Sequence, residues 1–283
     1  MIRIITDSAS DISQKKAAEW GIQVLPLKIH FGTEEYLDGV TLSNQEFYEK
    51  LFESDVIPKT SQIPPFEYEQ VFKKAVEEGN EVLCFCLSSG VSGSFQSASM
   101  AAKAYPGQVY VLDTRQFCVS EYIIVHRAVQ YRDQGYDAKT IVSLMQKDIQ
   151  EAHVIAMFNT LEYLKLGGRL SGAAAFAGEL LSIKPVLTIE EGVVKIIGKA
   201  RGSKRGNNLL REAVENLGGI DFDRPVCLGC TGYGDELLRK YVEDSRSLYL
   251  GHEDQLQYTS VGATIGTYAG PGAIALAFFA ESK

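Results

Sequence analysis

The loop at residues 88–94 carries hydroxyl groups and glycines in an order that could bind an anion. It reads SSGVSGS and stands between an apolar run at 81–87 and a helix-like stretch at 93–105. A loop of this kind at the start of a helix places backbone N–H groups, serine hydroxyls and the positive end of the helix around one point. Phosphate and carboxylate both fit such a site. The alternative interpretation is that Ser92 or Ser94 only caps the helix.

Three further segments combine polar groups with backbone freedom. The run KTSQ at 59–62 comes shortly before two prolines, and its alternative role is to cap a helix that begins with proline. The run GGRLSG at 167–172 offers the guanidinium of Arg169, which can pair with a carboxylate or a phosphate. The glycine-rich run at 262–273 suits either a close approach of backbone to a ligand or a tight turn.

The common enzyme motifs fit this chain poorly. The glycine patterns of a P-loop and of a dinucleotide-binding turn after the first strand are both absent from the sequence. The run GVSGS at 90–94 differs from the serine-hydrolase turn G-x-S-x-G only at its last position. A serine-dependent acyl hydrolase or transferase that uses Ser92 is therefore the alternative function, and it needs a base within reach. A phosphate-ester enzyme built on Asp7 lacks its second acid, because position 9 is Ala9.

The cysteines and histidines do not predict a metal site. Cys227 and Cys230 have CxxC spacing but lie in a β-rich run without a second pair, so buried core cysteines are the favoured interpretation. The four histidines have no spacing typical of metal ligands.

Strands and helices must bring these segments together. The pattern predicts strands at 2–6, 23–27, 81–87 and 109–113, with helices at 13–20, 44–53, 65–78, 93–105 and 118–134. Three of the four strands are almost continuously apolar, which is typical of a parallel sheet buried on both faces. Ligands of such sheets bind beyond the carboxyl ends of the strands, where the loops at 7–11, 88–94 and 113–115 follow.

A second unit follows the first along the chain. Its pattern predicts a helix at 137–150, a strand at 153–158, an amphipathic stretch at 173–182 and a β-hairpin that turns at Glu190, Glu191 and Gly192. The predicted fold class is α/β with two domains. Residues 1–150 form a mainly parallel sheet flanked by helices, residues 151–283 form a mixed α+β domain, and the ligand lies in the cleft between them.

Composition narrows the partners of the protein. The 283 residues are 45% hydrophobic and 23% charged, which supports a folded core without disulfides. The formal charge of -8 opposes binding to nucleic acid. The longest apolar stretch, 273–280, is far shorter than the roughly 20 residues of a membrane-spanning helix. The short apolar run at the N-terminus and the odd number of cysteines favour a cytoplasmic protein.

Taken together, the marked segments give the chain a family resemblance. It resembles the DegV family of bacterial fatty-acid-binding proteins from its first strand to its last helix. The matching segments, in chain order, are ITDSASDIS at 5–13, KTSQ at 59–62, LSSGVSGSFQSA at 87–98, VLDTRQ at 111–116, LEYLKLGGRLSG at 161–172, LLSIKPVL at 180–187 and IGTYAGPGAIAL at 265–276. Each segment alone is weak evidence, but the ordered set is specific.

The resemblance implies a lipid-binding protein without catalytic activity of its own. In this family a single DegV-type unit holds one long-chain fatty acid and acts as the binding subunit of a bacterial fatty-acid kinase. A separate ATP-dependent catalytic subunit phosphorylates the carboxylate to an acyl phosphate for phospholipid synthesis. The fatty acid is the bound ligand and no other cofactor or metal is implied. A transient contact with a membrane surface stays open.

The resemblance also assigns residues. The head-group contacts fall on Thr60 and Ser92, with Ser61 and Gly93 beside them, and Arg169 either contacts the head group through water or faces the kinase. Tyr268 stands where many members have histidine. Tyrosine can donate a hydrogen bond, but unlike histidine it cannot take up and release a proton near neutral pH. The expected wall of the acyl tunnel consists of apolar residues in the stretch 173–187, namely Phe176, Leu180, Leu181 and Ile183.

Overall fold

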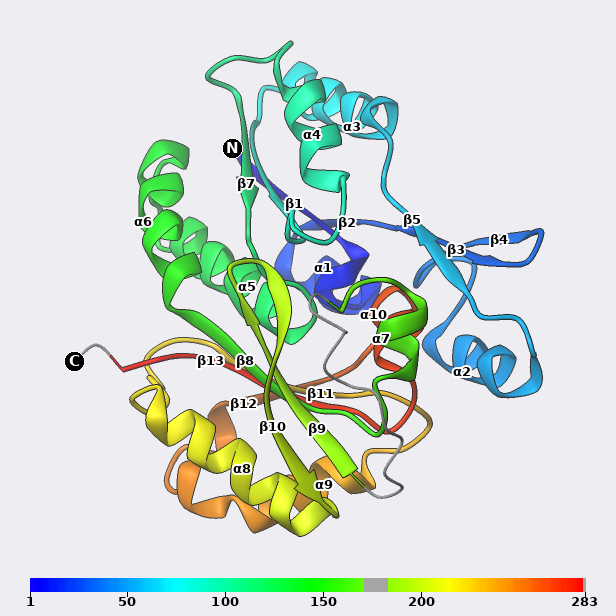
Figure 1. Ribbon diagram of the computed structural model, residues 1–283. Coiled ribbons are helices and arrows are strands. Elements are labelled where there is room, and N and C mark those ends of the chain that lie inside the picture. The colour runs from blue at the N-terminus through cyan, green and yellow to red at the C-terminus, as the bar shows by residue number, and fades with distance from the viewer. Residues whose placement is uncertain (171–182, 282–283) are drawn as a thin grey trace.

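The computed structural model describes residues 1–170 and 183–281, in which strands and helices alternate along the first half of the chain (Figure 1). The strands are β1 Ile2–Asp7, β2 Gln23–Leu25, β3 Lys28–Phe31, β4 Glu34–Leu37, β5 Lys59–Ser61, β6 Glu81–Cys86, β7 Val109–Asp113, β8 Ala152–Met157, β9 Ile183–Glu190, β10 Val193–Arg201, β11 Val226–Cys230, β12 Leu256–Ser260 and β13 Ile274–Phe279. The α-helices are α1 Gln14–Trp20, α2 Asn44–Glu53, α3 Pro65–Glu77, α4 Ser94–Ala102, α5 Val119–Asp133, α6 Ala138–Glu151, α7 Glu162–Leu166, α8 Ser203–Asn216, α9 Glu236–Asp244 and α10 Ala263–Ala269. Short 3-10 helices cover Ser8–Ser10, Arg246–Leu248 and Glu253–Gln255.

The N-terminal sheet is parallel, as predicted. Its order is β2-β1-β6-β7. Neighbouring residues of β1 point to opposite faces, and both faces are buried. Ile5 packs against α3 and α4 on one face, whereas Ile4 packs against α5 on the other. This two-sided burial explains why β1 and β6 are almost continuously apolar.

A small antiparallel sheet, ordered β4-β3-β5, is not predicted by the sequence pattern. The predicted strand at 23–27 ends at Leu25, and the chain then turns into β3. β5 contains only the three residues KTS, which are too few and too polar for a strand pattern. Because β5 pairs with β3, the segment that carries Thr60 is strand and does not cap α3, which begins with Pro65 after Pro64.

The C-terminal sheet is mixed and has the order β10-β9-β8-β13-β11-β12 in the described part of the chain. β11 and β12 run parallel, and the other neighbouring pairs are antiparallel. The predicted β9–β10 hairpin is confirmed. Its turn residues Glu191 and Gly192 have φ of 51° and 82°, the combination typical of a tight two-residue hairpin turn.

Helices α5 and α6 connect the two sheets through one hydrophobic core. Side chains of α5 such as Tyr122 and Val125 pack with Leu83 of the first sheet and with Val154 and Ala277 of the second. The first sheet lies within residues 2–113 and the second within residues 152–279. The division into domains at residue 150 stays a prediction, because this core contains residues from both sides of it.

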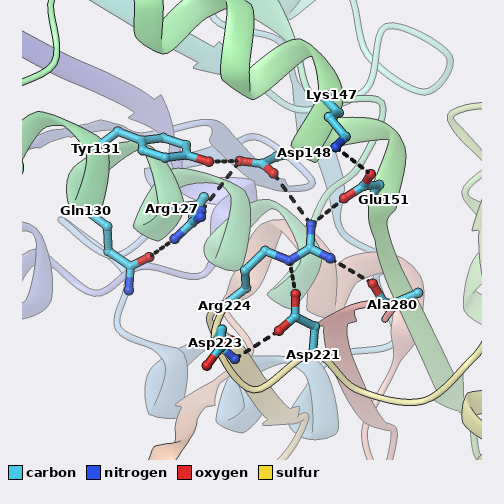
Figure 2. A network of polar contacts seen from close by, with 10 residues as sticks. All are labelled: Arg127, Gln130, Tyr131, Lys147, Asp148, Glu151, Asp221, Asp223, Arg224 and Ala280. Atoms are coloured by element: carbon cyan, nitrogen blue, oxygen red, sulfur yellow. Dashed lines mark hydrogen bonds and ion pairs between the residues drawn. The ribbon is translucent and has the colours of Figure 1, made fainter. Parts of the chain in front are cut away.

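A polar junction ties the end of α6 to the C-terminal sheet (Figure 2). The buried guanidinium of Arg224 donates to Asp221 at 2.6 Å, to Glu151 at 2.5 Å and to the carbonyl oxygen of Ala280 at 2.7 Å. Asp148 of α6 lies 3.5 Å from the same guanidinium and accepts a hydrogen bond from Tyr131 of α5 at 2.9 Å. We call this group of residues the Arg224 junction.

Candidate ligand-binding site

Two neighbouring cavities lie between elements of the first and second halves of the chain. The polar cavity, of about 220 Å³, is lined by Thr60, Gln62, Ser92, Gly93, Arg169 and Tyr268 together with apolar residues. The apolar cavity, of about 60 Å³, is lined mainly by aliphatic residues of the C-terminal sheet, among them Val154, Leu187 and Ile274.

The two cavities share part of their walls. Phe117, Phe158, Val194, Ile265 and Ala269 line both of them. Five common residues mean that the cavities are adjacent, so one ligand could place a polar end in the first and an apolar end in the second. This arrangement is typical of sites that bind an amphipathic molecule.

The strand β5 determines which hydroxyl of KTSQ can reach the polar cavity. Successive residues of a strand point to opposite sides, so Thr60 and Ser61 cannot face the same space. Thr60 and Gln62 line the cavity, whereas the Ser61 hydroxyl lies 2.8 Å from Nε2 of His30. The structure therefore separates Ser61 from the predicted head-group residues.

Helix α4 brings Ser92 and Gly93 to the same cavity. The N-cap residue is Gly93, which has no side chain that could cap the helix, so any cap must come from the preceding Ser92. Ser92 Oγ accepts a long hydrogen bond of 3.3 Å from the N–H of Ser94, the first residue of α4, and lies 3.1 Å from the Ser94 hydroxyl. Ser92 thus lines the cavity and also caps the first turn weakly. A Cβ at Gly93 would collide with the side-chain amide of Gln62, which explains the glycine.

Helices α7 and α10 supply the opposite wall and lie side by side, with β5 close to them (Figure 1). The Tyr268 hydroxyl of α10 is 2.6 Å from the Thr60 hydroxyl. The Arg169 guanidinium follows α7 and lies over the Tyr268 ring, 5.0 Å from its centre. Arg169 also donates to the carbonyl oxygen of Gly167 at 2.8 Å. Thus three residues separated by up to 208 positions in sequence converge on one cavity.

Buried carboxyl groups lie behind this wall. The side chain of Asp7 is fully buried and accepts from the N–H groups of Leu87 and Ala9 at 2.9 and 3.1 Å. Burial raises the pKa of Asp7 to about 7 and that of Asp11 to about 8. Asp7 thus positions the loops after β1 and β6 and does not line either cavity, which disfavours a phosphate-ester enzyme.

None of the four predicted tunnel residues is seen to line a cavity in the part of the chain that the structure describes. Phe176, Leu180 and Leu181 lie outside the described residues. Ile183 is half-buried at the start of β9, opposite Arg201, and is not among the residues that line the two cavities. The apolar lining that the structure describes comes from β8, the later part of β9 and α10. It includes Leu187, the last residue of the predicted stretch 173–187, and the tunnel residues before it stay a prediction. Gln62 is also absent from the predicted site, although it belongs to the quoted run KTSQ.

The hydrolase alternative needs a base near Ser92. Among the described residues, the hydrogen-bond partners of the Ser92 side chain are the hydroxyl and the N–H of Ser94. The four histidines all lie in other contacts. His30 contacts Ser61, His126 accepts or donates to Gln257, and the rings of His153 and His252 lie against Phe278 and Phe222.

The described residues outside the two cavities include a third cavity, the cysteines and the candidate metal ligands. A third cavity of about 620 Å³ lies beside α8 and the β9–β10 hairpin, but none of the predicted head-group residues lines it. Cys227 is buried in β11, as predicted, whereas Cys230 at the end of this strand is only half-buried. Within residues 1–170 and 183–281, no three His, Cys, Asp or Glu side chains gather as a metal site would require. Over the same residues, no helix has the length and hydrophobicity to cross a membrane.

Comparison with known proteins identifies the family. Residues 1–281 match the family described as "Uncharacterised protein, DegV family". The chain belongs to the DegV family. A DegV domain-containing protein of Caldanaerobacter subterraneus is 35% identical over an alignment of 287 positions that covers 99% of each protein.

Solved DegV structures agree with this fold. One is described as "Fatty Acid Binding of a DegV family Protein from Thermus thermophilus"; it is 30% identical, has a TM-score of 0.90 and covers 99% of each chain. Another, a stearic acid-binding protein from Eubacterium ventriosum, is 25% identical with a TM-score of 0.86 and covers 99% of this chain and 98% of its own. The parallel N-terminal sheet and the mixed C-terminal sheet of this DegV protein are thus those of its family.

Proposed function

We propose that this DegV protein binds one long-chain fatty acid, with its carboxylate among the hydroxyls of the polar cavity and its acyl chain running along the shared wall into the apolar cavity. The observation that carries the proposal is the shared wall between a cavity lined by Thr60, Ser92 and Arg169 and a cavity lined by aliphatic side chains. The related proteins from Thermus thermophilus and Eubacterium ventriosum, described as fatty-acid-binding, support it.

The head group is a carboxylate because the donors at this site suit a single negative charge. Thr60, Tyr268 and Ser92 supply hydroxyls, and the start of α4 adds N–H groups without partners inside the helix. The Arg169 guanidinium lies at the same cavity but is exposed, so water screens its charge. Burial of the acyl chain then provides most of the affinity, about 0.8 kcal/mol for each methylene before ordering costs.

We further infer that the protein serves in the cytoplasm as the binding subunit of a fatty-acid kinase and has no catalytic activity of its own. The bound carboxylate would be presented to a separate catalytic subunit. Its oxygen attacks the γ-phosphorus of ATP, ADP leaves, and the product is an acyl phosphate. The open donors around one end of the ligand suit such a transfer, since hydroxyls bind a carboxylate without covering every oxygen lone pair.

Calorimetry with lipid-free protein tests the binding step. Palmitate should bind with one-to-one stoichiometry, and hexadecanol, which has the same chain without the charge, should bind at least tenfold more weakly. Equal affinity for the two ligands would refute the proposed carboxylate site. If neither ligand binds, the proposed fatty-acid binding is refuted.

Product trapping tests the kinase step. The loaded protein, a fatty-acid kinase catalytic subunit and ATP are mixed with hydroxylamine, which converts an acyl phosphate to a hydroxamate. A hydroxamate that requires both proteins supports the proposal. Its absence, with binding intact, would leave a fatty-acid-binding protein that is not a kinase subunit.

A further inference from the structure

Helix α10 carries the wall that both cavities share, and its first turn is held by a buried side chain from the other half of the chain. Ile265 and Ala269 line both cavities, and Tyr268 meets Thr60. Asp38, between β4 and α2, accepts from the Ala263 N–H at 3.1 Å through Oδ1. The position of the wall therefore depends on contacts made outside the cavities.

The Asp38 carboxylate uses both of its oxygens on α10. Oδ2 accepts from the Thr264 N–H at 3.1 Å and from the Thr264 hydroxyl at 2.5 Å. Asp38 is 2% exposed, so these hydrogen bonds are shielded from water. Helix α10 has no side-chain cap of its own among the described residues, because its N-cap is Gly262.

Glycine at position 262 allows this close approach. A Cβ there would lie 3.2 Å from Oδ1 of Asp38 and 3.4 Å from Oδ1 of Asp11, which accepts from the Gly262 N–H at 2.7 Å. The next turn of α10 is tighter still, because a Cβ at Gly266 would lie 2.6 Å from the Phe47 ring. Contacts with Asp38, Asp11 and Phe47 thus hold the first two turns of the helix.

We propose that Asp38 is the positioning residue of the ligand site: it holds the start of α10 and thereby places Tyr268 against Thr60 and the fatty-acid carboxylate. This inference rests on the proposed function for its ligand. Asp38 lines neither cavity, yet by this proposal it contributes to the affinity for the fatty acid.

Asp38→Asn tests the proposal, because an amide has one acceptor oxygen and would turn an NH2 group towards a backbone N–H. Palmitate affinity should fall about tenfold. Asp137→Asn is the matched control. Asp137 accepts from the N–H and the hydroxyl of Thr140 at 3.0 and 2.8 Å, at the start of α6, which contributes no residue to either cavity. Its affinity should stay within twofold of the wild type.

A double-mutant cycle with Tyr268→Phe separates positioning from a general structural effect. In the Tyr268→Phe background, Asp38→Asn should change affinity by less than threefold. An undiminished effect in that background, or unchanged affinity in the single variant, would overturn the proposal. If Asp38→Asn does not fold, Gly262→Ala, which crowds the same contact, is judged by the same criteria with an expected loss of about threefold.

Hydrogen exchange of lipid-free protein keeps this result distinct from the binding proposal. Asp38→Asn should accelerate exchange of the amides at 263–269, whereas Asp137→Asn should not. Unchanged exchange at 263–269 would contradict the positioning role. A wild-type protein that binds no fatty acid would refute the proposed function while the exchange result still decides whether Asp38 holds α10.

Discussion

The Arg224 junction and the polar cavity both join the first half of the chain to the second. The polar groups of the junction are paired with each other, whereas those of the cavity face open space. At the junction, the Arg224 side chain is 7% exposed, and its guanidinium contacts Glu151, Asp221 and a carbonyl oxygen (Figure 2). At the cavity, the Thr60 and Tyr268 hydroxyls contact each other and still line open space.

The difference separates a structural contact from a ligand site. Buried charges that are fully paired fix geometry, and removing one partner is costly because the others stay buried. Hydroxyls keep spare donor and acceptor capacity, so they can bind a ligand without a large cost when the site is empty. Substitutions at the junction should therefore change stability, and substitutions at the cavity should change affinity.

The largest expected effect is at the junction. Arg224→Ala removes the cation of Asp221 and the nearer of the two cations of Glu151, which keeps Lys147 at 3.7 Å. Because both carboxylates are half-buried, the free energy of unfolding should fall by about 3 kcal/mol in urea denaturation. Arg239→Ala is the control, because Arg239 pairs with Asp235 at an exposed site and should change stability by less than about 1 kcal/mol. Similar losses in the two variants would show that the junction is no more than a surface ion pair.

The second largest expected effect is a pH-dependent change in stability at Asp11, which contacts the start of α10. The pKa of Asp11 is about 8 in the folded protein and about 4 in an unfolded chain, so its stabilisation is complete below pH 4 and is lost as the pH rises towards 8. Asp11→Asn keeps the Oδ1 acceptor and tolerates the φ of 55°. Relative to wild type, its free energy of unfolding should rise by about 1.4 kcal/mol per pH unit between pH 5 and 7.

Urea denaturation at each pH measures this difference. Asp133→Asn makes the same exchange at a side chain that is 61% exposed and is the control for the substitution itself. A flat difference for Asp11→Asn would mean that Asp11 is ionised in the folded protein at neutral pH.

At the cavity, affinity should change and stability should not. Thr60→Val and Ser92→Ala should each weaken palmitate binding by about 2 kcal/mol, roughly thirtyfold, because a hydrogen bond to a charged group is lost. Ser61→Ala is the matched control, since its hydroxyl faces His30 and not the cavity. Calorimetry with palmitate measures the affinity of the three variants. If all three lose affinity equally, or if none does, the carboxylate does not bind beside Thr60 and Ser92.

The smallest expected effect concerns Ser92 as a nucleophile. Its hydroxyl contacts only Ser94 among the described residues, so no base activates it. A fluorophosphonate probe should label wild type no more than Ser92→Ala, as read by mass spectrometry of the intact protein. Stoichiometric labelling that disappears in Ser92→Ala would restore the hydrolase alternative.

Local patterns predicted much of this fold. The apolar runs identified β1, β6 and β7, because strands buried on both faces need such residues. The predicted helix at 44–53 agrees with α2, whose start carries the reciprocal hydrogen bonds of Ser43 and Glu46. The small sheet escaped prediction because β3, β4 and β5 are three or four residues long and are defined by pairing with each other.

The sequence by itself determined the family, the parallel sheet and the segments that carry hydroxyls and glycines, because these depend on residue type and short-range spacing. Tertiary structure decided which of those groups share a space. Thr60 and Tyr268 meet across 208 positions, while Ser61, next to Thr60, points to His30. The direction of a side chain in a short strand is set by its pairing partner, and the place of α10 is set by Asp38, so neither can be read from local pattern.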